Sequence, residues 1–248
     1  MEDNSKKKDS MLDLDSILQQ MRRDSATMTR NFDNLADEEI YKKHANLLVF
    51  IANQLLHPQR RQFEVDDNNK DVLRFLLYYF NDCELCEQVF TNKHYKLHNH
   101  ILLCGTAGTG KTLLMQIFSE YLRLTKNPNF FYNLSVTQMV NYYTLHNNLD
   151  RYTYNEESCK GFKAQPVNIC LNDIGVGSKT YFGMDTKLLT DEFLHARNEI
   201  WTAYGKFGHV TTNLDVKMLK QEFSDGFGRL IDRFKTYNVI ALQGESRR

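Results

Sequence analysis

The residues with the clearest chemistry lie in segment 105–112, which reads GTAGTGKT. One glycine, four further residues and then Gly-Lys-Thr is the spacing of a loop that binds the phosphates of a nucleoside triphosphate. Small residues let backbone N–H groups approach the phosphates, Lys111 adds a positive charge, and the Thr112 hydroxyl can bind Mg²⁺. We therefore predict a triphosphate and Mg²⁺ site with these contact residues: Gly105, Thr106, Ala107, Gly108, Thr109, Gly110, Lys111, Thr112 and Leu113.

A second candidate for metal chemistry is the apolar segment 167–175, in which Asn172 and Asp173 are the polar pair. In triphosphatases, such a strand carries a carboxylate for Mg²⁺, followed by an acid that polarises the attacking water. In the usual register, Asn172 joins Thr112 at the metal and Asp173 is the water-activating acid. In the other register, Asp173 is the metal carboxylate and no catalytic base remains. Because an amide lacks the carboxylate charge, Asn172 at the metal predicts slow hydrolysis or a switch that only binds nucleotide.

The segments around these residues alternate between strand and helix patterns. The apolar run 101–104 before the loop suits a buried parallel strand, and apolar residues at three- and four-residue spacing follow the loop, as in a helix packed on a sheet. Alternating strands and helices predict an α/β fold with a five-stranded parallel sheet. The other strand candidates are 130–132, 167–171, 209–212 and 238–242, and helices are predicted over 136–145 and 186–204.

A small helical region is predicted ahead of this sheet. Residues 1–10 are polar, and two apolar stripes at helical spacing follow, from Met11 to Met21 and from Ile40 to Leu55. Each stripe either packs within the protein or presents a helix to a protein partner. We therefore expect a partner-binding region of residues 1–60 and a nucleotide-binding domain of residues 61–248.

Composition limits the classes of protein that fit. The chain of 248 residues is 42% apolar, enough to bury one α/β core. Basic and acidic residues both number 31, so any nucleic-acid contact must rest on a local patch. No apolar run approaches the length of a membrane span, which predicts a cytoplasmic protein. Four basic residues flank the region where a DNA patch could lie, although each is expected to be solvated: Lys179, Lys187, Arg197 and Lys206.

The five cysteines fit a reducing compartment. Cys83 and Cys86 have the spacing of a metal-binding or redox pair, with three histidines nearby. A zinc site would need a second ligand pair, and the interval from Cys86 to His94 is shorter than in a zinc finger. We therefore expect structural cysteines on a helix.

Three further segments carry a family resemblance. Segment 209–214 reads HVTTNL, segment 228–234 reads GRLIDRF, and segment 237–248 reads YNVIALQGESRR. Together with GTAGTGKT and NDIG, they resemble the DnaC/IstB-like branch of the AAA+ ATPases, which comprises replicative helicase loaders and their transposon-borne relatives. The resemblance runs from Phe63 to Arg248. It implies an AAA+ P-loop NTPase fold, ATP as the nucleotide, and no helical lid domain after the fifth strand.

The resemblance also implies roles for individual residues. Asn213 matches the sensor 1 residue that reads the γ-phosphate, and Arg233 matches the arginine finger inserted into the site of a neighbouring subunit. Arg248 matches the sensor 2 arginine, with Arg247 as the alternative. A guanidinium forks onto phosphate oxygens, which suits both arginine roles. The implied activity is ATP hydrolysis at subunit interfaces, with the following catalytic residues: Lys111, Asp173, Asn213 and Arg233.

Three functions follow from this resemblance and the residues. The first is an ATP-dependent loader that holds a DnaB-type helicase through residues 1–60 and assembles on single-stranded DNA. The second is a transposition regulator of the IstB type, which polymerises on duplex DNA. The third is a nucleotide-gated adaptor with little hydrolysis, which Asn172 allows. Filaments on duplex DNA would favour the second, and single-turnover hydrolysis separates the third from both.

Overall fold

The computed structural model describes residues 32–158, 163–175, 180–181, 184–223 and 232–247. The contacts divide the chain between Phe32 and Asp33, and residues 33–248 form one compact unit. This boundary lies earlier than the predicted one at residue 60, so residues 33–60 belong to the same unit as the phosphate loop. The apolar stripe from Met11 to Met21 lies outside the described residues.

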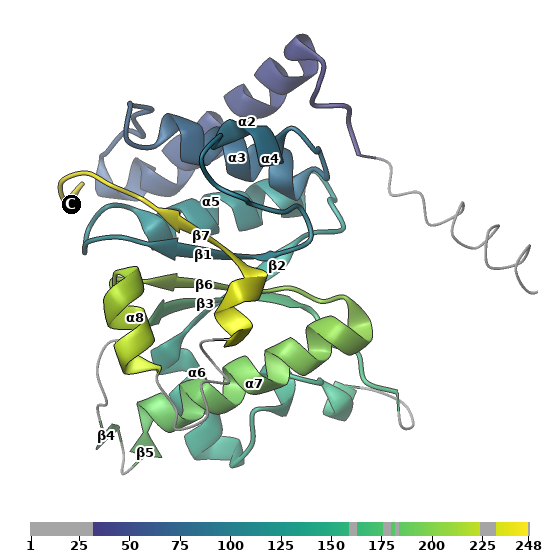
Figure 1. The fold of residues 1–248 in the computed structure, drawn as a ribbon, viewed down its shortest axis with the longest axis vertical. Helices are drawn as coiled ribbons and strands as arrows, with labels where there is room; N and C mark the ends of the chain where they lie inside the picture. The colour runs from purple at the N-terminus through teal and green to yellow at the C-terminus, as the bar shows by residue number, and fades with distance from the viewer. Residues whose placement is uncertain (1–31, 159–162, 176–179, 182–183, 224–231, 248) are drawn as a thin grey trace, which may run out of the picture. The chain divides into compact units, whose positions relative to one another are not determined.

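Five parallel strands form the central sheet, in the order β2-β3-β6-β1-β7 (Figure 1). The register is regular except between β3 and β6, where it shifts between Leu171 and Ile174. The predicted α/β fold with a five-stranded parallel sheet is therefore confirmed. The strands are β1 His100–Cys104, β2 Phe131–Ser135, β3 Asn168–Ile174, β6 Gly208–Thr212 and β7 Tyr237–Ala241.

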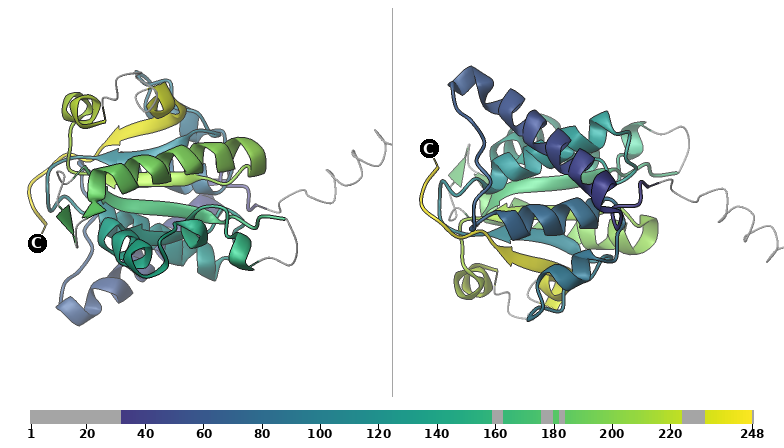
Figure 2. Two further views of the ribbon diagram at one scale, coloured as in Figure 1. Left: turned by 90° about the horizontal axis from the view of Figure 1, so that it is seen from below. Right: turned by 90° about the horizontal axis from the view of Figure 1, so that it is seen from above.

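Helices cover both faces of the sheet because side chains alternate along each buried strand. Ile101 and Leu103 pack with α2, α3 and α5, whereas Leu102 and Cys104 lie in the cluster that contains α6, α7 and α8. Figure 1 shows these two helix groups above and below the strands, and Figure 2 shows each group from its own side. The helices are α2 Glu38–Leu56, α3 Lys70–Phe80, α4 Cys86–Val89, α5 Lys111–Leu124, α6 Val136–His146, α7 Thr186–Tyr204 and α8 Val216–Glu222.

Shorter elements connect these layers. Neither α8 nor the antiparallel pair of β4 and β5 is among the elements predicted from the sequence. In the described segment after β7, residues 242–247, the chain forms no helix. The short elements are η1 His57–Gln59, η2 Asp150–Tyr152, η3 Glu156–Ser158, β4 Thr180–Tyr181, β5 Met184–Asp185 and η4 Phe234–Thr236.

Helix α2 is part of the compact unit that contains the phosphate loop. It begins at Glu38, and the carboxylate of the preceding residue, Asp37, accepts the N–H groups of Glu39 and Ile40 and so caps the helix. Its inner face buries Leu48 and Ile51 in the same cluster as α3 and α5. The stripe predicted between Ile40 and Leu55 therefore packs on the main domain, as in the first of its two alternatives.

Two buried histidines join β1 and β6 at the amino-terminal end of the sheet. His100 Nδ1 accepts the N–H of Gly208 at 3.2 Å, and His209 Nδ1 accepts the N–H of Ile101 at 3.0 Å. Burial lowers the pKa of His100 to about 3 and also lowers the pKa of His209 well below its usual value. Both rings therefore serve as neutral acceptors that hold the two strands together.

Arg197 lies at the same end of the sheet and is 1% exposed. Its Nη2 donates to the carbonyl oxygens of Val167 at 2.8 Å and Phe207 at 2.7 Å, which precede β3 and β6. Burial lowers the pKa of this guanidinium to about 10. The expectation of a solvated Arg197 was wrong, because α7 turns this residue onto the sheet.

Candidate nucleotide-binding site

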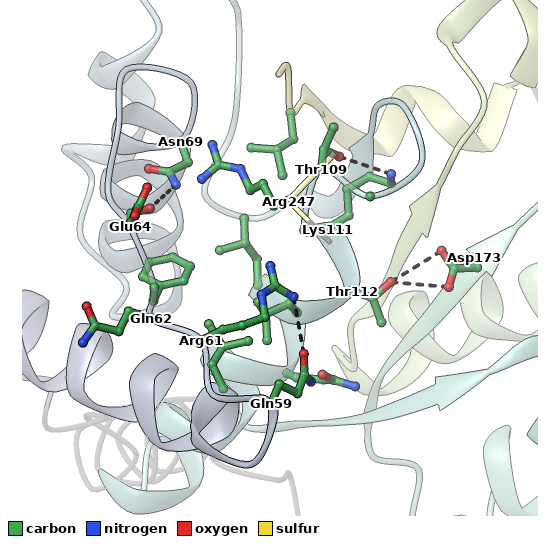
Figure 3. A pocket seen from close by; sticks show the side chains of 18 of the residues that line it. Gln59, Arg61, Gln62, Glu64, Asn69, Thr109, Lys111, Thr112, Asp173 and Arg247 are labelled. Carbon is green, nitrogen blue, oxygen red and sulfur yellow. Dashed lines mark hydrogen bonds between the residues drawn. The ribbon is translucent and has the colours of Figure 1, made fainter. Parts of the chain in front are cut away.

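A pocket of about 1020 Å³ lies at the carboxyl ends of β1, β3, β6 and β7 (Figure 3). Parallel strands bring the residues that follow them to one edge of the sheet, where α/β proteins bind ligands. The volume is at the upper end of the roughly 300–1,000 Å³ typical of small-molecule sites. One wall comes from the phosphate loop and the strand ends, and the other from residues 56–69.

Lys111, the first residue of α5, is 4% exposed and its ammonium lies within the phosphate loop. Nζ donates to the carbonyl oxygens of Gly105 and Thr106, both at 2.8 Å, and to Oδ1 of Asn213 at 2.9 Å. Asn213 follows β6 directly, so the pocket brings together two residues that are far apart in the sequence. The acceptors are neutral, and charged phosphate oxygens would bind the ammonium more strongly.

Thr112 and Asp173 meet at one end of the pocket (Figure 3). The Thr112 hydroxyl oxygen lies 3.4 Å from each carboxylate oxygen of Asp173. A hydroxyl and a carboxylate are hard oxygen ligands of the kind that Mg²⁺ prefers, so the two side chains fit this ion. Asp173 has φ of 63°, a left-handed conformation uncommon outside glycine, at the place where the β3–β6 register shifts.

Asn172 does not border the pocket. Its side chain is 4% exposed and lies between the neighbouring strands. Nδ2 donates to Oδ1 of Asn133 on β2 at 3.1 Å, and Oδ1 accepts the hydroxyl of Thr211 on β6 at 3.3 Å. Of the two registers left open by the sequence, this geometry favours the one in which Asp173 is the metal carboxylate.

Residues 242–247 pass over the phosphate loop. The N–H of Leu242 donates to the carbonyl of Cys104 at 2.8 Å, and the N–H of Arg247 donates to the carbonyl of Gly108 at 2.9 Å. Gly108 has φ of 87°, and a Cβ added there would lie 2.3 Å from the Ser246 hydroxyl oxygen. Gly108 is therefore required by the close approach of the tail as well as by its own backbone conformation.

Arg247 reaches the pocket wall, and its Nη2 donates to Oδ2 of Asp66 at 2.7 Å. This hydrogen bond holds the pKa of the Asp66 carboxyl below its usual value. Arg248 lies outside the described residues, so the arginine that the structure places at the pocket is the alternative named from the sequence. Asp66 was missed because it belongs to no motif.

The opposite wall, residues 59–64, was also missed from the sequence. Its backbone is fixed by two asparagines: Asn53 on α2 accepts the N–H of Phe63 at 2.8 Å, and Asn69 donates to the carbonyl of Glu64 at 2.8 Å. In Figure 3, Glu64 lies on the side of the pocket away from Asp173. This wall combines an aromatic ring with polar groups, a combination suited to a nucleobase.

Arg233 is the one predicted catalytic residue that does not border the pocket. It lies directly before η4 and is half-buried. Its Nη1 is buried and has no hydrogen-bond partner in the described parts of the chain. The site of a single chain therefore brings together Lys111, Asp173 and Asn213, but not Arg233.

Cys83 and Cys86 pack against the core that covers one face of the sheet. Burial raises the pKa of the Cys86 thiol to about 12, which disfavours the thiolate needed for metal binding. Within the described ranges, no group of three or more His, Cys, Asp or Glu side chains is placed to hold a metal. In the same part of the chain, every helix is too short or too polar to cross a membrane.

No family model matches the chain, and no curated protein matches it. Among solved structures, it is similar to AMPPCP-bound DnaA from Aquifex aeolicus, with 17% identity, a TM-score of 0.48, and coverage of 74% of this chain and 49% of that chain. It is also similar to a putative primosome component from Streptococcus pyogenes serotype M3, with 14% identity, a TM-score of 0.49, and coverage of 74% and 84%. Domain III of DnaA from Thermotoga maritima gives 20% identity, a TM-score of 0.49, and coverage of 73% and 65%.

The chain thus spans about half the length of the Aquifex DnaA chain. The fold rests on the structure itself: the strand order, the phosphate loop after β1, and Asp173 at the end of β3. On these grounds, the chain has an α/β fold in which a five-stranded parallel sheet carries the phosphate loop directly after β1.

Proposed function

We propose that the pocket binds Mg²⁺–ATP, with the triphosphate on residues 105–112. The observation that carries the proposal is the meeting of Lys111, Thr112, Asp173 and Asn213 at one pocket, from separate elements of the sheet. Helix α5 has 14 residues, and its N-terminal N–H groups and dipole favour an anion at the loop. Lys111 would exchange the loop carbonyls for phosphate oxygens.

The remaining polar groups take complementary roles in this proposal. Thr112 and Asp173 hold Mg²⁺, which neutralises charge on the phosphates. Asn213 and Arg247 bind the terminal phosphate in this proposal, which is supported by their place in the lining of the same pocket as Lys111. Arg233 acts on the pocket of a neighbouring subunit, so complete sites form only in an assembly.

Hydrolysis is expected to be slow. The two acidic residues that line the described pocket are Asp173 and Glu64, and they lie on opposite sides of it (Figure 3). If Asp173 holds the metal, none of the other described residues that line the pocket places a carboxylate beside it to polarise the attacking water. This observation favours a second candidate function, a nucleotide-gated adaptor that binds ATP and turns it over rarely.

The biological role that we propose is the loading of a DnaB-type helicase onto single-stranded DNA. It is supported by the motifs that resemble the DnaC/IstB-like branch, and by the pocket to which four of them, segments 105–112, 172–175, 209–214 and 237–248, contribute lining residues. Because residues 33–60 belong to the nucleotide-binding unit, the proposed partner-binding segment is narrowed to residues 1–32.

The test is to mix the full chain with the DnaB-type helicase of its own host, with ATP and Mg²⁺, and to measure the mass of the co-eluting species by light scattering. A complex that contains the helicase hexamer, and that is lost on deletion of residues 1–32, supports the loader. A chain that binds ATP but not the helicase contradicts it. Filaments on duplex DNA would then indicate a transposition regulator. ATP that is bound but hardly hydrolysed in a single-turnover measurement would identify the adaptor.

A further inference from the structure

Thr211 lies at the centre of a buried hydrogen-bond network beneath the pocket. This residue of β6 is 0% exposed. Its hydroxyl accepts the N–H of Asp173 at 3.0 Å and donates to Oδ1 of Asn172 at 3.3 Å. A hydroxyl has one donor and two acceptor sites, so both bonds form at once. One side chain thus binds both polar residues at the end of β3.

The network continues from Asn172 to the helix that follows the phosphate loop. Asn172 donates through Nδ2 to Asn133 on β2 at 3.1 Å, and Asn133 donates through its own Nδ2 to the carbonyl of Met115 at 3.3 Å. Met115 lies one turn after Thr112 on α5. The network therefore links three strands to the helix that carries the hydroxyl facing Asp173.

The network also surrounds an unusual backbone conformation. Asp173 has φ of 63°, and the β3–β6 register shifts between Leu171 and Ile174. A left-handed residue other than glycine persists where neighbouring groups hold it. Thr211 holds the N–H of Asp173, and the hydroxyl of Thr212 donates to the carbonyl of Ile174 at 2.8 Å. Two consecutive threonines of β6 thus fix the bulge on both sides of Asp173.

We propose that Thr211, Asn172 and Asn133 are positioning residues that hold the Asp173 carboxylate toward the Mg²⁺ of the bound nucleotide. The proposal rests on the proposed binding of Mg²⁺–ATP and goes beyond it by giving Asn172 a role away from the metal. An amide suits this place because it accepts from Thr211 and donates to Asn133. An ionised carboxylate could accept from Thr211 but could not donate to Asn133.

The test uses Thr211→Val, which removes the hydroxyl at nearly constant shape, and Thr211→Ser, which keeps it. The affinity for AMPPCP, an ATP analogue with a non-hydrolysable β–γ bond, is measured by calorimetry with excess Mg²⁺ and again with EDTA. We expect the EDTA affinity to be equal in all three proteins, because the phosphate loop is unchanged. The gain in affinity on adding Mg²⁺ should fall about 10-fold or more in Thr211→Val and remain in Thr211→Ser.

A matched control is Thr190→Val on α7, a buried threonine whose hydroxyl donates to the carbonyl of Thr186. It should keep the full gain in AMPPCP affinity on adding Mg²⁺, called the Mg²⁺ gain below. If Thr211→Val is folded and also keeps that gain, the positioning role is overturned. If the unmodified protein shows no Mg²⁺ gain, the proposed Mg²⁺–ATP site itself fails. Should Thr211→Val not fold, Asn133→Ala replaces it, and an unchanged Mg²⁺ gain there overturns the proposal.

Discussion

Two buried cationic side chains, Lys111 and Arg197, lie at opposite ends of the sheet and make similar hydrogen bonds in different surroundings. Lys111 lies at the carboxyl ends of the strands and donates to the carbonyls of Gly105 and Thr106. Arg197 lies at the amino ends and donates to the carbonyls of Val167 and Phe207. Their exposed fractions are 4% and 1%. Under the proposed function, neither burial nor carbonyl contacts therefore distinguish a residue that binds the nucleotide from a structural one.

The surroundings of the two cations make the distinction. Lys111 borders a pocket of about 1020 Å³, next to the hydroxyl of Thr112 and the carboxylate of Asp173. Arg197 is instead surrounded by protein: Gly208 packs against its side chain, and Val167 and Phe207, the residues before β3 and β6, accept its hydrogen bonds. Under the proposed function, Lys111 exchanges its carbonyl partners for phosphate oxygens, whereas Arg197 keeps its carbonyl partners.

The largest expected effect concerns the amino end at low pH. His100 is held neutral by burial, and its pKa of about 3 lies below the ordinary 6.5 of the unfolded chain. The contribution of the neutral His100 ring to the free energy of unfolding is complete above pH 6.5, and it is lost as the pH falls toward 3. For His100 alone the loss between pH 7 and pH 4 is about 3 kcal/mol, and His209 acts in the same direction. Urea unfolding at several pH values measures it.

The matched variants for this prediction are His100→Asn and His94→Gln. Asparagine keeps an acceptor for the N–H of Gly208 but does not titrate, so His100→Asn should flatten the fall in stability below pH 6.5. His94 is exposed, and His94→Gln should leave the fall unchanged. An equal slope in all three proteins would show that the buried ring does not cause the acid sensitivity.

The next largest effect is expected on removing the Arg197 side chain. Arg197→Ala removes a buried side chain and leaves the carbonyls of Val167 and Phe207 without their donor, so the free energy of unfolding should fall by about 2 to 3 kcal/mol. Chemical denaturation measures this loss. Arg123→Ala on the exposed side of α5 is the control and should leave the free energy of unfolding nearly unchanged. A weakened AMPPCP affinity in folded Arg197→Ala would contradict a purely structural role.

A smaller effect is expected from two glycines with positive φ. Gly108→Ala places a Cβ 2.3 Å from the Ser246 hydroxyl oxygen, whereas Gly205→Ala meets nothing within 4 Å. Both changes strain the backbone, at a cost of about 1 kcal/mol or more. Gly108→Ala should also displace residues 242–247 and weaken AMPPCP binding, and Gly205→Ala should not. Calorimetry on both variants tests this. Equal AMPPCP affinity in the two variants would show that residues 242–247 do not contribute to binding.

The smallest effect is expected at Asp66. The Asp66–Arg247 ion pair is partly exposed, so Asp66→Asn should reduce stability by no more than about 1 kcal/mol. It should weaken AMPPCP binding a few-fold if the pair holds Arg247 at the pocket wall. Glu120→Gln removes the partner of Arg123 far from the tail and should leave binding unchanged. Tighter binding in Asp66→Asn would mean that the carboxylate competes with phosphate for Arg247.

Local patterns predicted much of the sheet and the phosphate loop. The apolar run before GTAGTGKT and the spacing after it indicated β1 and α5, since strand and helix periods are set by neighbours in the sequence. The same periods do not reveal which element covers which face, so the place of α2 against α5 was not predicted. The burial of Arg197 could have been predicted from its spacing, because it lies on the same face of α7 as the buried Phe193 and Ile200.

Other parts of the site depend on contacts that sequence patterns do not encode. Which of Asn172 and Asp173 faces the pocket is set by the left-handed backbone at Asp173 and by its bond to Thr211. Residues 59–64 join the pocket because Asn53 and Asn69 fix their backbone, and neither asparagine belongs to a motif.

The most direct test of the central claim is calorimetric titration of ATP with Mg²⁺ into the unmodified protein and into Lys111→Ala, with thermal melts of both. The account predicts binding at one site per chain, and a loss of roughly 10- to 100-fold in affinity for Lys111→Ala in a protein that still unfolds cooperatively. Equal affinity in the two proteins would contradict it, because the triphosphate would then not lie on the phosphate loop.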